Sequence, residues 1–229
     1  MISFEHTEVF NFNGAIRGMR NPLNSWDKSD SYYYPDYEDQ GLNARYVVGE
    51  NDQGLMKKLI NSGSDHRKFM RQIFVCVDIT APLYWWKEFD TYKVGTVSNS
   101  CSTMHKIHDK EFELNDFSVE HLSPQSLNLL QDIIIMLNQY RAYYNAKDDK
   151  KIDMHTKMSD ECYAKYKKEL WWQMIQLLPT SYNQRRTITL TYENIYNMRK
   201  ARRNHKLDEW RVGFMDWSDY LPYAAELFD

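Results

Sequence analysis

The strongest constraint on the fold is a repeating apolar pattern in residues 123–147, which read "SPQSLNLLQDIIIMLNQYRAYYNAK". Apolar side chains recur there every three or four residues, the spacing that places them on one face of an α-helix. The members of this stripe are Leu127, Leu130, Ile133, Ile134, Leu137 and Tyr140. Ser123 is a favourable N-cap, and Pro124 is well tolerated in a first helical turn. The segment therefore predicts a long amphipathic helix.

The flanking segments predict a mixture of strands and helices. The expected elements are a helix over residues 51–64, a strand over 68–82, a helix over 81–93, a loop or short strand over 96–106, and a second long helix over 161–178. Gly63 and Pro179 mark the ends of two of these helices, and Pro82 closes the strand. From residue 181 onward the chain predicts a Thr-rich extended piece followed by further helices.

Residues 11–45 have a different character from the rest of the chain. They mix Gly, Pro, Asn, Asp and Ser with several aromatic residues, and apolar repeats are few. We therefore expect an ordered but irregular loop region that faces a ligand or a partner. No internal repeat or low-complexity linker divides the sequence, so residues 1–229 are expected to form a single α+β domain.

Composition excludes several classes of protein. The chain is 42% hydrophobic and 27% charged, as ordinary globular proteins are, and its apolar runs fall well short of the ~20 residues of a membrane-spanning helix. The N-terminus has no signal-peptide pattern. The three cysteines (Cys76, Cys101 and Cys162) lack CxxC spacing, which argues against disulfides and zinc and favours a reducing cytoplasm. A net charge of −3 does not favour bulk nucleic-acid binding.

General catalytic motifs are absent from the sequence. It has no Gly-rich phosphate loop, no HExxH and no GxSxG. His105 and His108 are a close pair, but no carboxylate pattern accompanies them, so solvated histidines are the preferred interpretation. Cys101 has no His at a recognisable partner spacing and is interpreted as inert. The Trp85-Trp86 and Trp171-Trp172 pairs are expected to pack in a core rather than to stack on a ligand.

A cluster of basic residues could bind phosphate. It comprises Arg199, Lys200, Arg202 and Arg203, with Arg185 and Arg186 upstream. Guanidinium groups bind phosphate oxygens in pairs, but a solvated helix face paired with Asp208 and Glu209 is the preferred interpretation. Composition and spacing alone therefore predict an α+β domain with a polar loop and a basic helix, and they name no reaction.

Taken in order, the segments resemble the flavin-dependent thymidylate synthases. Residues 177–211, "LLPTSYNQRRTITLTYENIYNMRKARRNHKLDEWR", are similar without a gap to the C-terminal motif of that family. Asn197 falls on the family's flavin-contacting Asn or His, and Arg202 falls on the Arg that binds the pyrimidine nucleotide. Upstream, "HRKFMRQIFVCVDITAPLYWW" resembles the family's strand-then-helix lead-in, with His66 on a commonly seen His. The resemblance covers roughly residues 60–215.

Residues 91–107 resemble the family's signature, R-H-R-x-x-S-x-N-E-x-S-x-R-Y. One register sets Lys93 on the last residue of the basic trio, Thr96 on the first Ser, Asn99 on Glu and Cys101 on the second Ser. A one-residue slip instead sets Asn99 on Asn and Ser102 on Ser. Both registers remain open.

The resemblance implies an α+β fold, with a central, mostly antiparallel sheet and packed helices, that assembles as a homotetramer. FAD and nucleotide would bind at subunit interfaces, and a one-carbon unit would pass from methylenetetrahydrofolate to the 5-position of dUMP, with NADPH as reductant and no protein nucleophile. The implied flavin-site residues are Lys93, Thr96 and Asn197. The implied nucleotide-site residues are Asn99, Cys101, Ser102 and Arg202.

Departures from the family pattern leave three interpretations. The signature keeps one cation, its acid and last Arg are gone, and Glu193 replaces the Arg before the flavin contact. The preferred interpretation is a divergent enzyme that binds flavin through Lys93, Arg67 or Arg71 and acts on dUMP, or on dCMP through the Asn99 amide, giving a methyl or hydroxymethyl product. The second is a flavin- or nucleotide-binding protein without transfer activity, and the third is a structural or regulatory assembly protein. On the first interpretation, Arg202 is expected to be an exposed helix residue that binds nucleotide and contributes little to stability.

Overall fold

The computed structural model describes residues 2–34, 45–146, 151–153, 156–157 and 159–228 of the chain. It has the expected α+β architecture, with an antiparallel sheet and packed helices. The chain forms two compact units. The first, here called the hairpin unit, consists of residues 80–87 and 100–186; the second, here called the sheet unit, consists of residues 2–79 and 88–99 and of the chain from 187 onward.

Helices and strands are interspersed along the described residues. The helices are α1 (Phe12–Arg20), α2 (Glu50–Asn61), α3 (Leu83–Phe89), α4 (Pro124–Asn145), α5 (Asp160–Leu177), α6 (Tyr192–Arg202), α7 (Met215–Asp219) and α8 (Ala224–Leu227). The strands are β1 (Ser3–Phe10), β2 (Tyr32–Tyr34), β3 (Arg45–Val47), β4 (Phe74–Pro82), β5 (Val97–Ser100), β6 (Lys151–Asp153), β7 (Thr156–Lys157) and β8 (Asn183–Thr191). Two shorter helices matter below, the 3₁₀-helix η3 (Arg67–Arg71) and the π-helix η5 (Glu209–Phe214).

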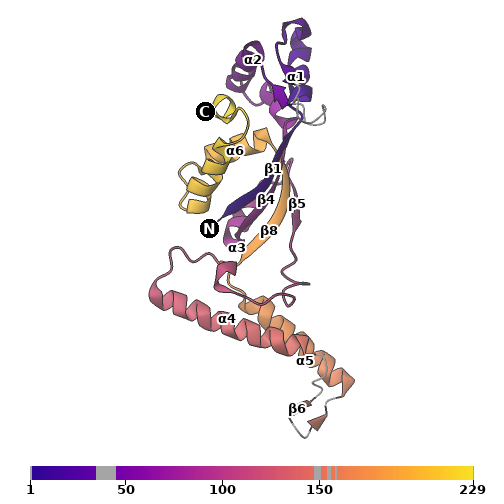
Figure 1. Cartoon of the computed structure of the whole chain (residues 1–229), viewed down its shortest axis with the longest axis vertical. Helices are drawn as coiled ribbons and strands as arrows, with labels where there is room; N and C mark the ends of the chain where they lie inside the picture. Colours follow the sequence, from indigo (N-terminus) through magenta and orange to yellow (C-terminus); the bar gives the residue numbers. More distant parts are fainter. Residues whose placement is uncertain (1, 35–44, 147–150, 154–155, 158, 229) are drawn as a thin grey trace. The chain divides into compact units, whose positions relative to one another are not determined.

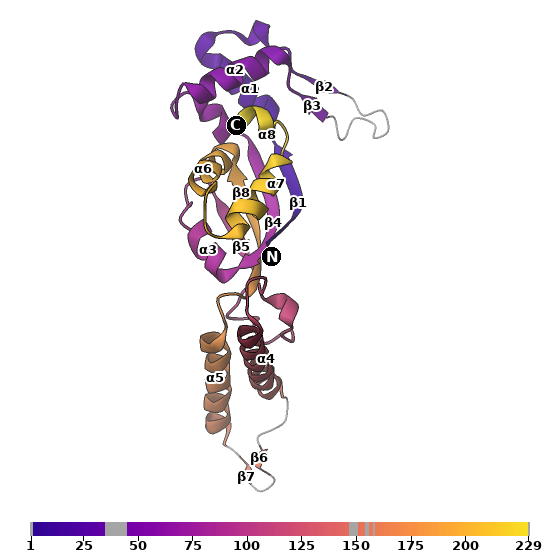
Figure 2. The same cartoon turned by 90° about the vertical axis from the view of Figure 1, so that its left-hand side faces the viewer.

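The main sheet has the strand order β1-β4-β8-β5. Along β4 the residues Val75, Val77 and Ile79 are fully buried, whereas their neighbours are half-buried or exposed. This period of two is typical of a strand with one covered face. The strand predicted for residues 68–82 is therefore confirmed over its second half, while its first residues form η3 instead. Helices α6, α7 and α8 lie on one face of the sheet (Figures 1 and 2).

Aromatic side chains dominate the core of the sheet unit. Trp210 is fully buried, stacks on Phe89 with ring centroids 6.4 Å apart, and meets Phe214 edge-on at 5.1 Å. Tyr192, the first residue of α6, is also fully buried and donates its hydroxyl to the carbonyl of Pro222 at 2.8 Å. Burial raises the pKa of Tyr192 far above its ordinary range. These contacts fix α6 against the C-terminal segment.

The hairpin unit is built around the pair α4 and α5, which lie side by side (Figure 2). Its core contains Leu130, Ile134 and Leu137 from α4 and Met174 from α5, all buried. The Ser123 hydroxyl accepts from the backbone N–H of Ser126, the capping bond that the sequence predicts. The predicted helix and its apolar face are thus confirmed, although the other members of the stripe are only half-buried.

The prediction that residues 11–45 are irregular is wrong for residues 12–20, which form α1. The buried side chains of α1 are Phe12, Ala15, Ile16, Met19 and Arg20. The first four have helical spacing, but Gly14 and Gly18 lie among them, and glycine disfavours an isolated helix by ~1 kcal/mol. Packing of this buried face outweighs that cost. Residues 35–44 lie outside the described part of the chain.

No helix in the described part of the chain is long and apolar enough to cross a membrane.

Candidate functional site

A turn after α3 meets the N-terminus of α6 inside the sheet unit. The turn comprises residues 93–96 and closes with the N–H of Thr96 on the carbonyl of Lys93 at 3.5 Å. Gly95 has φ = +76°, a conformation that side-chain-bearing residues rarely adopt. Asn194 donates its amide to the carbonyl of Val94 at 2.7 Å. A Cβ on Gly95 would lie only 3.1 Å from the Asn194 Oδ1 atom, so the close approach requires glycine.

The same Asn194 also caps α6. Its Oδ1 accepts from the backbone N–H of Thr191 at 3.0 Å, and the Thr191 hydroxyl accepts from the N–H of Asn194 in return. This reciprocal arrangement is a capping box. One amide therefore both starts the helix and holds the turn beside it, so the two elements that the sequence assigns to the site lie together.

A small cleft of about 250 Å³ lies at this turn. Its lining residues are Phe89, Asp90, Tyr92, Lys93, Thr96 and Ser98. Two predicted flavin-site residues, Lys93 and Thr96, are among them. Lys93 is exposed, whereas Thr96 is half-buried and its hydroxyl bonds back to the carbonyl of Tyr92. Ligand sites for drug-sized molecules usually span roughly 300–1,000 Å³, so this cleft suits a phosphate or a single ring rather than a whole dinucleotide.

Arg202 reaches the same cleft through Tyr92. Its Nε donates to the Tyr92 hydroxyl at 2.9 Å, and Nη1 donates to a Glu88 carboxylate oxygen at 2.7 Å. The guanidinium also lies over the rings of Tyr92 and Trp210, at 5.5 and 5.2 Å from their centroids. His205 Nε2 lies 3.0 Å from the same Glu88 oxygen.

The expectation that Arg202 is an exposed helix residue is therefore wrong. Its side chain is only 19% exposed, because two aromatic rings and a carboxylate surround it. A guanidinium has five N–H donors, and these two bonds use two of them. Arg202 is held in one orientation and still has donors to offer a ligand.

Asn197 lies in a second charged group, on another face of α6. It is exposed, and its Oδ1 accepts from Arg67 Nη2 at 3.3 Å. Glu193 is buried and accepts from Arg67 Nε at 3.1 Å and from both Nε and Nη2 of Arg71. Hydrogen bonding to Glu193 raises the pKa of Arg71. The acid that departs from the family pattern is thus neutralised by two arginines of η3, and the group keeps a net positive charge.

The remaining predicted nucleotide-site residues are divided between the two units. Asn99 is an exposed residue of β5 in the sheet unit. Cys101 and Ser102 belong to the hairpin unit, where Cys101 is exposed and its N–H donates to the carbonyl of Arg185 at 3.0 Å. The Ser102 hydroxyl accepts from the N–H of His105 at 2.9 Å and so closes a local turn. Lys93 and Thr96 line one cleft within the sheet unit, and Arg202 bonds to Tyr92, which lines the same cleft.

The basic cluster is neither one phosphate site nor a solvated helix face. Arg199 is buried, with Nη1 2.7 Å from an Asp219 oxygen, and Lys200 lies over the Tyr196 ring at 4.3 Å. Arg203 is exposed. The preferred interpretation of a solvated face is therefore wrong for Arg199, which is buried and pairs with Asp219 of the C-terminal segment. Asp208 pairs with Arg211.

The other candidates behave mostly as structural residues. Trp85 and Trp86 are fully buried and meet edge-on at 4.9 Å, which confirms core packing for this pair. Trp172 is 43% exposed. Among the described residues no group of three or more His, Cys, Asp or Glu side chains could hold a metal ion.

Sequence reasoning missed Glu88 and the role of Tyr92. Glu88 is the carboxylate that orients Arg202, and it lies 114 positions away in the chain. No local pattern marks such a partner. An indirect signal was available, because a cation that packs among aromatic rings requires a nearby acid.

Comparison with known proteins supports the architecture. No protein-family model and no curated protein matches the sequence. Among solved structures, thymidylate synthase X from Helicobacter pylori, crystallised with FAD and dUMP, matches with a TM-score of 0.59 and 15% identity, over 100% of this chain and 96% of that one. A second structure of the Helicobacter pylori flavin-dependent enzyme, complexed with FAD and dUMP, matches with a TM-score of 0.60 and 16% identity, over 100% and 97%. The chain therefore has the fold of the flavin-dependent thymidylate synthases.

Proposed function

We propose that this protein is a divergent flavin-dependent enzyme that transfers a one-carbon unit from methylenetetrahydrofolate to the 5-position of a pyrimidine deoxynucleotide. The substrate is dUMP or dCMP, the product carries a methyl or a hydroxymethyl group, and NADPH serves as reductant. One observation carries the proposal furthest. In a chain with this fold from end to end, the Asn194–Val94 and Arg202–Tyr92 bonds join the Gly95 turn to the helix of Arg202, beside a cleft lined by Tyr92, Lys93 and Thr96.

The donor set at the cleft fits part of a flavin dinucleotide. Lys93 supplies a cation for a phosphate, and Thr96 lines the same cleft, while Asn197 offers an amide beside Arg67 on the neighbouring face of α6. Bound FAD would supply the hydride that reduces the transferred carbon. Since the cleft is smaller than the dinucleotide, the rest of the cofactor would be held by other subunits of a homotetramer.

The residues of this chain bind and orient the reactants. Arg202, fixed by Glu88 and Tyr92, would bind the nucleotide phosphate with its remaining N–H groups. Within the sheet unit, Asn99 would bond the edge of the base. No protein nucleophile is assigned, and Cys101 is not proposed to attack the base.

The test begins with the absorbance spectrum. We expect purified protein to be yellow, and dialysed protein to regain the flavin bands on titration with FAD. Lys93→Ala should weaken FAD binding, whereas Lys87→Ala, which removes an exposed lysine of α3, should leave it unchanged. The reconstituted protein should then convert dUMP or dCMP in the presence of methylenetetrahydrofolate and NADPH. Colourless protein that ignores added FAD would contradict the proposal.

A second candidate is a flavin- or nucleotide-binding protein without transfer activity. The arginines expected to bind phosphate already have acidic partners in this chain, which favours this candidate. Glu88 pairs with Arg202, and Glu193 pairs with Arg67 and Arg71. On this alternative dUMP or dCMP raises the melting temperature, because a ligand that binds only the folded state stabilises it, but no one-carbon transfer is detected. Detection of product removes this candidate. A purely structural role predicts no stabilisation by any nucleotide or flavin.

A further inference from the structure

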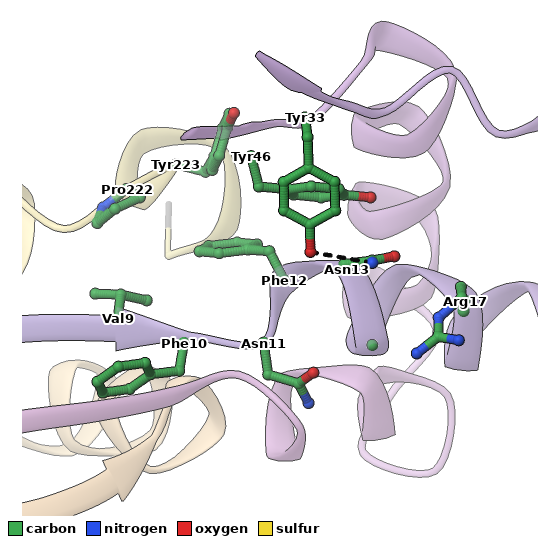
Figure 3. Close-up of a pocket in the computed structure, with 11 residues that line it drawn as sticks. Val9, Phe10, Asn11, Phe12, Asn13, Arg17, Tyr33, Tyr46, Pro222 and Tyr223 are labelled. Atoms are coloured by element: carbon green, nitrogen blue, oxygen red, sulfur yellow. Dashed lines mark hydrogen bonds between the residues drawn. The ribbon is translucent and has the colours of Figure 1, made fainter. Parts of the chain in front are cut away.

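Another pocket in the described part of the sheet unit lies away from the Gly95 turn. It has a volume of about 730 Å³ and shares no lining residue with the cleft of Lys93. Its walls come from the end of β1, the first two turns of α1, the β2–β3 hairpin and residues 222–223 (Figure 3). This volume falls within the usual range for small-molecule sites.

Hydrogen bonds between distant segments hold the walls in place. Asn13 donates its amide to the Tyr33 hydroxyl at 3.1 Å, which ties α1 to the hairpin. The Tyr223 hydroxyl accepts from the N–H of Val48 at 2.8 Å, which ties the C-terminal segment to the end of the hairpin. Tyr33 also meets the ring of Tyr46 edge-on at 4.9 Å. The pocket is therefore formed before a ligand arrives, which lowers the entropic cost of binding.

Two lining residues have a strained backbone. Asn11 has φ = +71° and Tyr223 has φ = +59°, and they are two of the four non-glycine residues with positive φ in the described chain. This region is costly for a bulky side chain such as that of Tyr, and such strain persists where the surroundings impose it, often at ligand sites. A Cβ on Gly14 would lie 2.2 Å from Asn11 Oδ1, so a larger residue there would displace the Asn11 side chain.

The lining combines exposed aromatic surface with one positive charge. Phe10 is 47% exposed and Tyr33 is 53% exposed, although both are large apolar or amphipathic rings. Arg17 is exposed, and none of the described residues that line the pocket is Asp or Glu. Figure 3 shows Phe10, Asn11 and Arg17 along one side, with Tyr33, Tyr46 and Tyr223 along the other. Burial raises the pKa of Tyr46, so its phenol stays neutral and able to donate.

We propose that this pocket binds a small planar aromatic anion, of about mononucleotide size, with its ring against Phe10 and Tyr33 and its acidic group at Arg17. Aromatic faces bind planar rings through stacking, and a guanidinium binds a phosphate or carboxylate through paired N–H groups. Both features are needed, because Arg17 is the one charged side chain among the described lining residues. The site uses none of the residues assigned above to flavin or nucleotide.

A set of three probes tests the two halves of the proposal. The probes are 1-naphthyl phosphate, which has a ring and an anion, 1-naphthol, which has the ring alone, and inorganic phosphate, which has the anion alone. In titration calorimetry on the full chain, we expect saturable binding of 1-naphthyl phosphate, at least tenfold tighter than either of the other two. Equal affinity for 1-naphthyl phosphate and 1-naphthol, or no saturable binding, overturns the proposal.

Variants then locate the binding. Arg17→Ala should weaken 1-naphthyl phosphate binding at least tenfold and leave 1-naphthol binding unchanged, whereas Phe10→Ala should weaken both. Lys57→Ala, an exposed cation of α2, is the charge-matched control and should change neither. Arg202→Ala separates this site from the proposed nucleotide site. If 1-naphthyl phosphate binding is lost in Arg202→Ala and kept in Arg17→Ala, the probe binds at the other cleft and the proposal is refuted. FAD binding is a separate measurement: Arg17→Ala should still take up FAD if the proposed function is correct.

Discussion

At the scale of single residues, Arg202 illustrates how the surroundings of a side chain determine its role. A guanidinium on a helix end is normally solvated and contributes little to stability. Here it bonds to Glu88 and Tyr92 and lies over two aromatic rings, one of them the buried Trp210. Such a group contributes to folding as well as to binding, because its removal takes one charged partner from the Glu88 carboxylate, which also lies beside His205.

We therefore expect Arg202→Ala to destabilise the fold by about 1–3 kcal/mol, the range for a partly exposed, charge-assisted bond. For a chain of this size that lowers the melting temperature by roughly 2–12 °C. Thermal unfolding followed by circular dichroism measures it. Arg203→Ala, which removes the exposed neighbour, is the control and should unfold within ~0.5 kcal/mol of the native chain. A melting temperature for Arg202→Ala equal to that of the control contradicts the assigned contacts.

At the scale of elements, Asp52 of α2 joins three segments of the sheet unit. It is fully buried and accepts from Arg20 of α1 at 2.6 Å and from the Ser29 and Ser31 hydroxyls at 2.7 and 2.6 Å. Burial raises the pKa of Asp52, but hydrogen bonds from Ser31, Ser29 and Arg20 outweigh it and hold the pKa below the ordinary value of 3.8. The carboxylate is therefore charged in the folded protein and organises the elements around it.

Because folding lowers the pKa of Asp52, this residue makes the folded protein less stable as the pH falls. The ionised Asp52 contributes its full stabilisation above the unfolded pKa, near pH 4, and loses it as the pH falls through the lower folded pKa. Asp52→Asn should cost about 3–5 kcal/mol at pH 7, because it leaves the Arg20 charge buried and unpaired. The variant should also lose less stability than the native chain between about pH 5 and pH 3. Urea unfolding across this range measures both effects, with the exposed Asp27→Asn as control.

Local sequence patterns predicted helices and strands correctly where the spacing of apolar residues was uninterrupted. The Ser123 cap and the apolar stripe predicted α4, and the alternation of Val and Ile predicted β4. Helix α1 was missed because Gly14 and Gly18 interrupt its apolar spacing. Its helical state depends on burying Phe12 and Met19 against other elements, which no local propensity reports.

At the scale of the whole molecule, the chain carries two separate cores. The aromatic core around Trp210 belongs to the sheet unit, and the aliphatic core around Leu137 belongs to the hairpin unit. A structure with two cores can open in parts, because each cooperative unit has its own free energy of opening.

Leu137→Ala tests this division. Leu137 is fully buried in the hairpin core, so its truncation should cost about 2–5 kcal/mol. Hydrogen exchange should show the loss of protection concentrated in α4 and α5, with α6 nearly unchanged. Leu129→Ala, a 62% exposed leucine of the same helix, should have little effect. A uniform loss of protection in both units would show that the chain opens as one.

Neighbours along the chain were enough to predict a polar loop after the helix of residues 81–93 and a basic helix that carries Arg202, because loops and helices depend on residues a few positions apart. The surroundings of Arg202 were not predictable in this way. Its partners Glu88 and Tyr92 lie 114 and 110 positions away, and the Asn194–Val94 bond spans 100. Burying a guanidinium requires an acid and hydrogen-bond acceptors, but which ones reach it depends on how α3 and α6 pack. Tertiary packing therefore decided that an arginine expected in solvent became a fixed, half-buried group at the cleft.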